Sequence, residues 1–255
     1  MRWRRWLLVA GVVVGALTAV VGALYLVALS VRHTETATRT FDGPVRRITI
    51  NAQAGRVRLA RSEGGRVEVE RKAVRSLGRP TITERLDGDR LQLSDGCPWF
   101  GTLCSVDWTV RVPDGTAVDV SASGGGVDAV DLRADMNLRS SGGGVHVTGG
   151  VGSLRLRSSA GGVSVEGAAA PTVDADSSGG GVRLSLVAVP GGVRAHSSAG
   201  GVSVEVPLDP AAYRVNAHSS GGGTHVSVRT DPFSERRITA SSSGGGVTVR
   251  YPKQP

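Results

Sequence analysis

Charged side chains recur at two alternating positions in consecutive repeats of this chain. The two positions lie eight and six residues before the Val or Thr that ends each repeat motif. In four consecutive repeats they hold Arg155 and Arg157, then Asp174 and Asp176, then Arg194 and His196, then Asn216 and His218. Opposite charges on neighbouring strands contribute roughly 0.2 to 1 kcal/mol per pair. Arginine and aspartate can also hydrogen-bond the hydroxyls and carboxylates of a glycan. The sequence therefore predicts a charged face that either stabilises the fold or binds a glycan.

A catalytic or metal site is a third interpretation of the same residues. A glycosidase needs two carboxyl groups that flank its substrate, one of them protonated, whereas Asp174 and Asp176 stand on one strand between arginine pairs. A metal would require His196, His218 and Asp176 to converge. The glycine-rich segments lack the Lys-Ser/Thr of a phosphate loop, the Asp of a calcium-binding turn and the Gly-x-Ser-x-Gly elbow. We therefore expect no enzymatic activity and no cofactor.

A short motif, Ser-(Gly/Ala)-Gly-Gly-(Val/Thr), sets the spacing of these charges. Its seven copies end at Val127, Val145, Val163, Val182, Val202, Thr224 and Val247. A period of about 20 residues is typical of repeat architectures, in which each unit buries its apolar face against its neighbours. The glycines are therefore part of a folded repeat and not of a flexible linker.

The repeat predicts an all-β fold with two strands per coil. Apolar residues occupy the positions nine and seven before each Val/Thr, and alternation resumes after the glycines, which is the pattern of half-buried strands. A meander of hairpins and a parallel β-solenoid both fit. The solenoid is favoured because stacked coils place equivalent residues above one another, which gives a reason to repeat serine and glycine at every level. We expect about seven regular coils, with hydroxyl ladders at the serines and positive φ at the glycines.

In this prediction the serines and glycines at the corners of the coils have a structural role. They include Ser141, Gly143, Gly144, Ser159, Gly161, Gly162, Ser178, Gly180 and Gly181. Residues 114–252 form the regular solenoid, residues 253–255 a tail, and the strand Val247–Tyr251 is expected at the exposed end, where Pro252 discourages further pairing.

Residues 43–113 keep strand character without the strict motif, and we expect them to form a degenerate N-terminal cap. Ala54-Gly55-Arg56-Val57 and Gly64-Gly65-Arg66-Val67 resemble worn copies of the corner, and Asp87-Gly88-Asp89 predicts a hairpin turn. Cys97 and Cys104 are the two cysteines. No histidine lies nearby in sequence to complete a metal site, so a disulfide that clips this loop is expected in an oxidising compartment.

An uncharged run from Leu7 to Val31 is long enough to cross a bilayer. Arg2, Arg4 and Arg5 precede it, so the positive-inside bias predicts a cytoplasmic N-terminus and an extracytoplasmic bulk. Residues 1–31 are thus predicted as a cytoplasmic stub and signal anchor in the cell membrane, and residues 32–42 as a stalk. A cleaved signal peptide is the alternative, but its apolar region is normally shorter.

Five features follow one another along the chain: Ile48-Thr49-Ile50, Ala54-Gly55-Arg56-Val57, Cys97 to Cys104, Val110-Arg111-Val112-Pro113 and the Ser-Ser-Gly-Gly-Gly-Val units. In this order they resemble the bacterial DUF4097 family, whose members are described as putative adhesins. The resemblance covers nearly all of the chain beyond the anchor. It implies a β-solenoid at the cell envelope and no catalytic residues. Members usually carry Ser-Gly-Asp-Val at the corner, and this chain lacks that acid.

These observations predict a membrane-anchored envelope scaffold or adhesin-like binding surface. A sensory or accessory subunit of an envelope-stress system is the alternative, and a glycan-active enzyme comes third. The partners expected are the membrane and a cell-wall glycan or another envelope protein. Nucleic acid is not expected, because the 30 basic residues, for a formal net charge of +8, form no block with interleaved aromatics.

Overall fold

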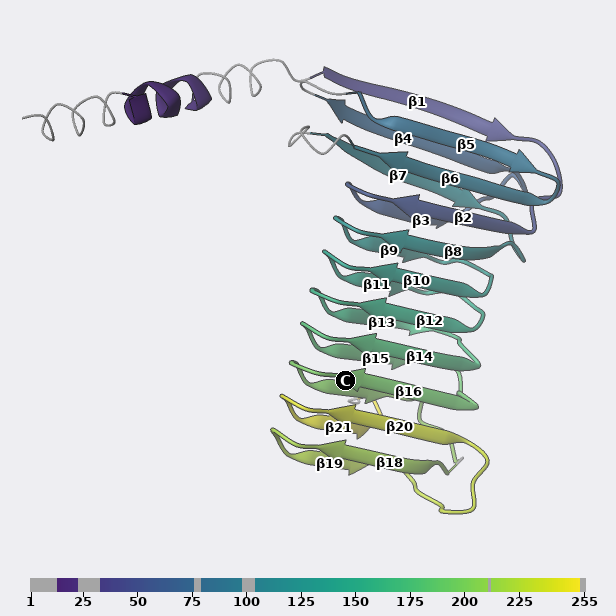
Figure 1. Cartoon of the computed structure of the whole chain (residues 1–255). Helices are drawn as coiled ribbons and strands as arrows, with labels where there is room; N and C mark the ends of the chain where they lie inside the picture. The colour runs from purple at the N-terminus through teal and green to yellow at the C-terminus, as the bar shows by residue number, and fades with distance from the viewer. Residues whose placement is uncertain (1–12, 23–32, 76–78, 98–103, 211, 253–255) are drawn as a thin grey trace, which may run out of the picture.

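The computed structural model describes residues 13–22, 33–75, 79–97, 104–210 and 212–252. It is a stack of coils with two strands each, which form two facing sheets (Figure 1). In spatial order, sheet A contains β1 (His33–Phe41), β4 (Val67–Arg75), β7 (Ser105–Val112), β3 (Val57–Arg61), β9 (Val127–Val130), β11 (Val145–Thr148), β13 (Val163–Ala168), β15 (Val182–Leu186), β17 (Val202–Glu205), β21 (Val247–Arg250) and β19 (Thr224–Ser227). Sheet B contains β18 (Arg214–Ser219), β20 (Arg237–Ser242), β16 (Gly192–Ser197), β14 (Thr172–Ser177), β12 (Leu154–Ser158), β10 (Met136–Ser140), β8 (Ala117–Ala122), β2 (Arg47–Ala52), β6 (Arg90–Gly96) and β5 (Thr81–Asp87).

The core lies between the sheets and is built from the apolar columns of the repeat. In β12, for example, Leu154 and Leu156 are buried while Arg155 and Arg157 are exposed. Side chains alternate between the two faces of a strand, so every coil adds its inward residues to one continuous core. The core contains both small and large residues, and Ala175 of β14 and Leu184 of β15, for example, are both fully buried. Each coil therefore depends on its neighbours to cover its apolar side chains.

The coils stack in parallel and in register, as the solenoid prediction required. Val145 of β11 pairs with Val127 of β9 on one side and with Val163 of β13 on the other. In sheet B, Leu156 pairs with Leu138 and Ala175 in the same way. Hairpins that turned at the glycines would have given antiparallel neighbours, so the meander alternative is wrong. The seven copies of the motif correspond to seven two-stranded coils, from β8/β9 to β20/β21.

The last two coils do not follow the order of the sequence. The β20/β21 coil pairs directly with β16/β17, and the earlier β18/β19 coil lies outside it, at the end of the stack. The prediction that Val247–Tyr251 forms the exposed end strand is therefore wrong. The exposed end coil is the one with Thr224 where every other coil has a buried valine, and Thr224 is itself exposed. Because a hydroxyl tolerates water, that coil suits the open end better than the β20/β21 coil with its buried Ile238 and Val249.

The N-terminal part adds two irregular coils and an antiparallel cover. β2/β3 stacks on β8/β9, β6/β7 stacks beyond it, and β4, β1 and β5 close the end with antiparallel pairs. The corner expected at Ala54-Gly55-Arg56-Val57 is present, and β5 and β6 form the expected hairpin. Gly64-Gly65-Arg66-Val67 leads instead into antiparallel β4, so it is not a coil corner. Residues 33–41 of the predicted stalk form β1, which pairs with β4 along its whole length.

Buried serines hold neighbouring coils together at the corner. The Ser177 hydroxyl lies 2.8 Å from the Gly161 carbonyl of the neighbouring coil and accepts from the Gly180 amide of its own corner at 3.1 Å. The same position donates to the neighbouring coil from Ser140, Ser158, Ser197, Ser219 and Ser242. The ladder thus runs from hydroxyl to carbonyl. It uses the serine just before the motif, whereas Ser141, Ser159 and Ser178, the predicted corner serines, are exposed.

The corner glycines are required by the close approach of the coils. None of the motif glycines in the seven regular coils has a positive φ, so the left-handed bend expected there is wrong. The irregular corner at Gly55 does have one, with a φ of 119°. A Cβ at Gly143, Gly161 or Gly180 would lie 2.5 to 2.6 Å from a backbone nitrogen of the adjacent corner. At Gly144, Gly162 and Gly181 the nearest carbonyl oxygen would be 2.9 to 3.1 Å away. Any side chain at these positions would push the coils apart.

Residues 13–22 form a helix, and the rest of the predicted anchor, residues 7–12 and 23–31, lies outside the described residues. Within the described residues, no helix combines the length and the apolar character that a membrane crossing needs.

Candidate functional site

The predicted charged face lies on the outer surface of sheet B. Arg155, Asp174 and Arg194 occupy adjacent coils in register, and so do Arg157, Asp176 and His196. Asp174 is within ion-pair distance of both arginines of the preceding coil, with its Oδ2 atom 3.8 Å from Arg155 Nε and 4.0 Å from Arg157 Nη2. These side chains are more than a third exposed, so solvent screens the pairs and each contributes little. This part of the face largely satisfies its own charges.

His218 lies apart from the predicted cluster. The displaced β20 strand stands between β16 and β18, so Ser241 is the neighbour of His196, and His218 is one coil further on. His196 Nδ1 and Ser241 Oγ are 2.9 Å apart. The predicted placement of His218 in the coil next to His196 is therefore wrong, and the convergence of His196, His218 and Asp176 that a metal site would require does not occur. Across the described residues, no three histidine, cysteine, aspartate or glutamate side chains gather closely enough to hold a metal ion.

A groove runs along the outer surface of sheet A, parallel to the stack. It has a volume of about 780 Å³ and crosses five consecutive coils, from β11 through β13, β15 and β17 to β21. Its floor is the column of glycines that precedes these strands, namely Gly144, Gly162, Gly181, Gly201 and Gly246. A Cβ at these positions would lie only 2.9 to 3.2 Å from a carbonyl oxygen of the next coil, so the close stacking disfavours side chains here and leaves the groove open. At a spacing of about 4.8 Å per coil, it is roughly 20 Å long.

Polar side chains form one wall of this groove, one from each coil. In spatial order they are His146, Ser164, Arg183, Ser203 and Thr248. Arg183 stands at the centre between two serines and makes no hydrogen bond or ion pair with any described residue. Glu166 adds a carboxylate that lies 3.4 Å from the Ser164 hydroxyl. An unpaired guanidinium between hydroxyls is suited to binding an anionic, hydroxyl-bearing ligand.

Both columns of the groove are visible in the repeat, as the last glycine of each motif and as the residue that follows each Val/Thr. The sequence prediction nevertheless contained no groove, because it gave the glycines a role only in the bends. A second hollow of about 420 Å³ on sheet B includes Arg155 and Asp174 of the predicted face. There Arg47 and Asn137 both bond Asp119, at 2.6 and 3.0 Å, so its polar groups are largely paired with one another.

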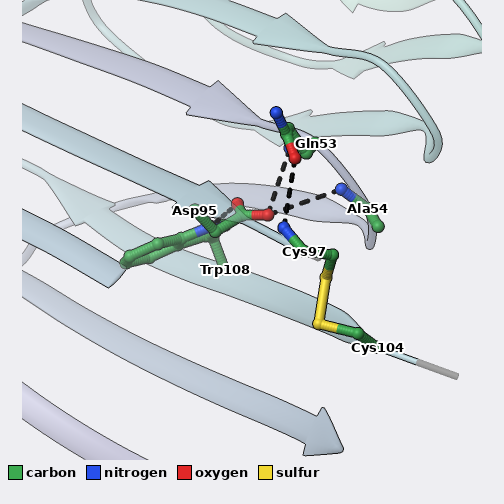
Figure 2. Close-up of a disulfide and its surroundings, with 6 residues drawn as sticks. All are labelled: Gln53, Ala54, Asp95, Cys97, Cys104 and Trp108. Atoms are coloured by element: carbon green, nitrogen blue, oxygen red, sulfur yellow. Dashed lines mark hydrogen bonds between the residues drawn. A yellow bond between two sulfur atoms is a disulfide. The ribbon is translucent and has the colours of Figure 1, made fainter. Parts of the chain in front are cut away.

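Cys97 and Cys104 form the predicted disulfide, which lies at the corner between β6 and β7 (Figure 2). Asp95 lies beside it. Its preceding residue, Ser94, pairs with Asn51, and this register places Asp95 in the same column as the corner serines of the regular coils. The buried Asp95 carboxylate accepts hydrogen bonds from Trp108 Nε1 at 2.8 Å and from the amides of Gln53 and Ala54 at 3.1 and 3.4 Å. Burial raises the pKa of Asp95, and these three hydrogen bonds act against that rise. The cluster fastens the first irregular coils to each other.

Three solved structures align with most of the chain. A putative adhesin from Bacteroides fragilis is 15% identical, with a TM-score of 0.42 over 86% of this chain and 97% of that one. A putative adhesin from Parabacteroides merdae is 12% identical, with a TM-score of 0.41 over 86% and 96%. A putative cell adhesion protein from Clostridium sporogenes is 10% identical, with a TM-score of 0.36 over 86% and 100%. None of the curated proteins matches the chain in sequence.

The regular part of the stack also matches a family model. The model of the Toastrack DUF4097 family covers residues 118–251, from β8 to the residue after β21. That match spans more than half of the 255 residues and includes every copy of the Ser-Gly-Gly-Val motif. The chain therefore belongs to the Toastrack DUF4097 family, as the sequence resemblance predicted.

Proposed function

We propose that the protein is an adhesin-like envelope protein, anchored by residues 7–31, whose solenoid outside the membrane binds an acidic glycan along the groove of sheet A. The observation that carries this proposal is the groove itself, which offers one polar side chain per coil over five coils. A linear polymer matches such a site because successive units meet successive coils. The role is one of binding and display, without catalysis.

The chemistry of the groove favours an acidic polymer over a neutral one. Arg183 is the unpaired charge at its centre, and a guanidinium binds a carboxylate through two parallel hydrogen bonds. Ser164, Ser203 and Thr248 can donate to or accept from sugar hydroxyls. On the opposite sheet, Arg155 and Arg157 are engaged with Asp174, which leaves them less available to a ligand. The groove is therefore a better site than the charged face of sheet B.

Binding of polygalacturonate and of neutral dextran to the purified full chain tests this proposal. Arg183→Gln should weaken polygalacturonate binding about tenfold, which corresponds to the loss of one charge-assisted hydrogen bond. The control is Arg194→Gln, which removes the same charge from the outer face of sheet B, where Arg194 also has no partner among the described residues. This control should leave the affinity within about twofold, because only Arg183 lies in the groove.

Titration by biolayer interferometry at physiological salt would measure both variants. Equal losses in the two variants would show that only the net positive charge of the chain attracts the polymer. Equal binding of dextran would show that the carboxylates are not recognised. Either result would contradict an acidic-glycan site in the groove.

A further inference from the structure

The groove of sheet A contains a carboxylate without an ion pair beside its unpaired guanidinium. Glu166 lines the groove from β13, and Arg183 lines it from β15, the adjacent strand of the sheet. No ion pair joins these two described residues, and Glu166 contacts the Ser164 hydroxyl of its own strand at 3.4 Å. Figure 1 shows β13 and β15 at consecutive levels of the stack. The site therefore presents opposite charges at two neighbouring levels.

A second carboxylate of the same column is already paired. This column lies two positions beyond the polar wall of the groove and holds Thr148, Glu166, Ser185, Glu205 and Arg250. Glu205 Oε2 lies 3.2 Å from Arg250 Nε, and Glu205 Oε1 lies 3.4 Å from the Ser185 hydroxyl. Of the carboxylates in the described part of the chain, Glu166 is the one that lines the groove. It is therefore the acidic group that a ligand would meet.

A β-bulge directly follows Glu166. The register between β13 and β15 shifts between Glu166 and Ala168, where Gly167 is the extra residue and has a φ of 70°. Glycine adopts this left-handed conformation without a steric cost from a Cβ. Bulges are over-represented next to active sites, where they change the direction of a side chain. The carboxylate of the groove thus stands at a local departure from the regular repeat.

Glu166 and Arg183 require different groups from a ligand. A carboxylate only accepts hydrogen bonds, so Glu166 requires a hydroxyl or an amide N–H, and it repels a second carboxylate. A guanidinium only donates, and it binds a carboxylate through two parallel hydrogen bonds. Consecutive coils are about 4.8 Å apart, which is close to the length of one pyranose residue in an extended glycan. Adjacent sugar residues in the groove therefore meet opposite requirements.

We infer that the groove selects a glycan in which acidic and uncharged sugar residues alternate. This inference rests on the proposed function, because it specifies the ligand of the same groove. The acidic residue binds at Arg183, and its uncharged neighbour donates hydroxyl or amide N–H groups to Glu166. An N-acetylhexosamine meets this requirement, since its amide is a hydrogen-bond donor. On the other side of Arg183, the Ser203 hydroxyl can donate or accept and so admits an uncharged neighbour as well.

Two oligosaccharides of equal length test this selection. A hyaluronate hexasaccharide alternates glucuronate with N-acetylglucosamine, whereas every residue of a galacturonate hexamer is acidic. The purified full chain should bind the hyaluronate hexasaccharide about tenfold more tightly, because the repulsion between Glu166 and a second carboxylate is absent. Net charge alone would favour the opposite order, since the chain carries +8 and the galacturonate hexamer has twice as many carboxylates. Isothermal titration calorimetry at physiological salt would measure both affinities.

Glu166→Gln isolates the contribution of the carboxylate. Glu166 is exposed on β13, so a side chain of nearly the same size should leave the fold intact. The affinity for the galacturonate hexamer should rise about tenfold, because the repulsion is removed. The affinity for the hyaluronate hexasaccharide should stay within about twofold, because the amide oxygen still accepts a hydrogen bond.

Asp176→Asn is the matched control, since it removes the same charge from the outer face of sheet B. Both affinities should stay within about twofold in this variant, because solvent screens a charge on the opposite sheet. A loss of the hyaluronate preference in Asp176→Asn as well would show that Glu166 acts only through the net charge of the chain.

The outcomes separate this selection from the proposed function. A preference for hyaluronate that disappears in Glu166→Gln is the expected result. Equal or tighter binding of the galacturonate hexamer by the unmodified chain would overturn the alternation and leave acidic-glycan binding at Arg183 intact. A preference that persists in Glu166→Gln would overturn the role of Glu166. Binding of neither oligosaccharide would refute the proposed function, and this inference with it.

Discussion

Gly161→Ala should destabilise the stack by about 3 kcal/mol, because a methyl group at this corner has no space. Its Cβ would lie 2.5 Å from the Gly144 nitrogen and 2.7 Å from the Gly143 carbonyl carbon. Both are backbone atoms of the neighbouring coil, which cannot rotate away as a side chain could. The coils would have to separate locally, which would weaken the ladder from Ser177 to the Gly161 carbonyl. Urea unfolding of the full chain, followed by circular dichroism, would measure the change.

Gly192→Ala is the matched control for this prediction. Gly192 begins β16, has no positive φ and leaves nothing within 4 Å of an added Cβ. Alanine there restricts the unfolded chain without strain, so the free energy of unfolding should stay the same or rise by up to about 1 kcal/mol. Equal effects of the two substitutions would mean that the glycines serve flexibility and not the approach of the coils.

Asp95→Ala should also cost about 3 kcal/mol, because it leaves three donors without their acceptor in a buried site. The donors are the Trp108 indole and the amides of Gln53 and Ala54. Asp107→Ala is the control: Asp107 accepts one exposed backbone amide, from Arg56 at 2.9 Å, so its loss should cost about 1 kcal/mol or less. Similar costs for both variants in urea unfolding would contradict the role given to Asp95.

The pH dependence of stability provides an independent check on Asp95. Because burial raises the pKa of Asp95 in the folded chain, its protonated form is favoured by folding. The resulting stabilisation is present below the pKa of the unfolded chain and is lost as the pH rises through the folded pKa. The stability of the unmodified chain should therefore fall relative to that of Asp95→Asn as the pH rises from about 4, the unfolded value, toward neutral. A constant difference between the two would contradict the raised pKa.

The repeat allowed the fold class to be predicted because identical residues stack on identical residues. The columns of Val, Ser and Gly distinguish a parallel solenoid from hairpins, since only the solenoid places each column in register. The disulfide between Cys97 and Cys104 was likewise predictable, because no histidine lies nearby in sequence to complete a metal site and an oxidising compartment was expected. In each case the decisive physical constraint was local or strictly periodic.

The order of the last coils was not predicted, although the sequence contains two indications of it. The connections 206–213 and 228–236 are longer than 169–171 between β13 and β14, and the extra length lets the chain pass over a coil and return. Thr224 also breaks a column of valines. Periodicity alone assumes that neighbours in sequence are neighbours in space. That assumption placed His218 beside His196, where the structure has Ser241.

The candidate site could be predicted only in part, for a related reason. The charges of Arg155, Asp174 and their neighbours favoured the outer face of sheet B, but these side chains are largely paired with one another. The groove is defined by missing side chains at the glycines, and its single unpaired arginine, Arg183, is not distinguished by sequence from the paired ones. Whether a charge is satisfied depends on the three-dimensional register of the coils.

The order and register of the coils determine every surface described above, and paired cysteines test them most directly. His196→Cys with Ser241→Cys should form an intramolecular disulfide, because these residues are partners on adjacent parallel strands about 4.8 Å apart. His196→Cys with His218→Cys should not, since one strand separates them and the distance is about twice as large. Peptide mass spectrometry under non-reducing conditions would detect the link. A disulfide between positions 196 and 218, with none between 196 and 241, would contradict this arrangement of the stack.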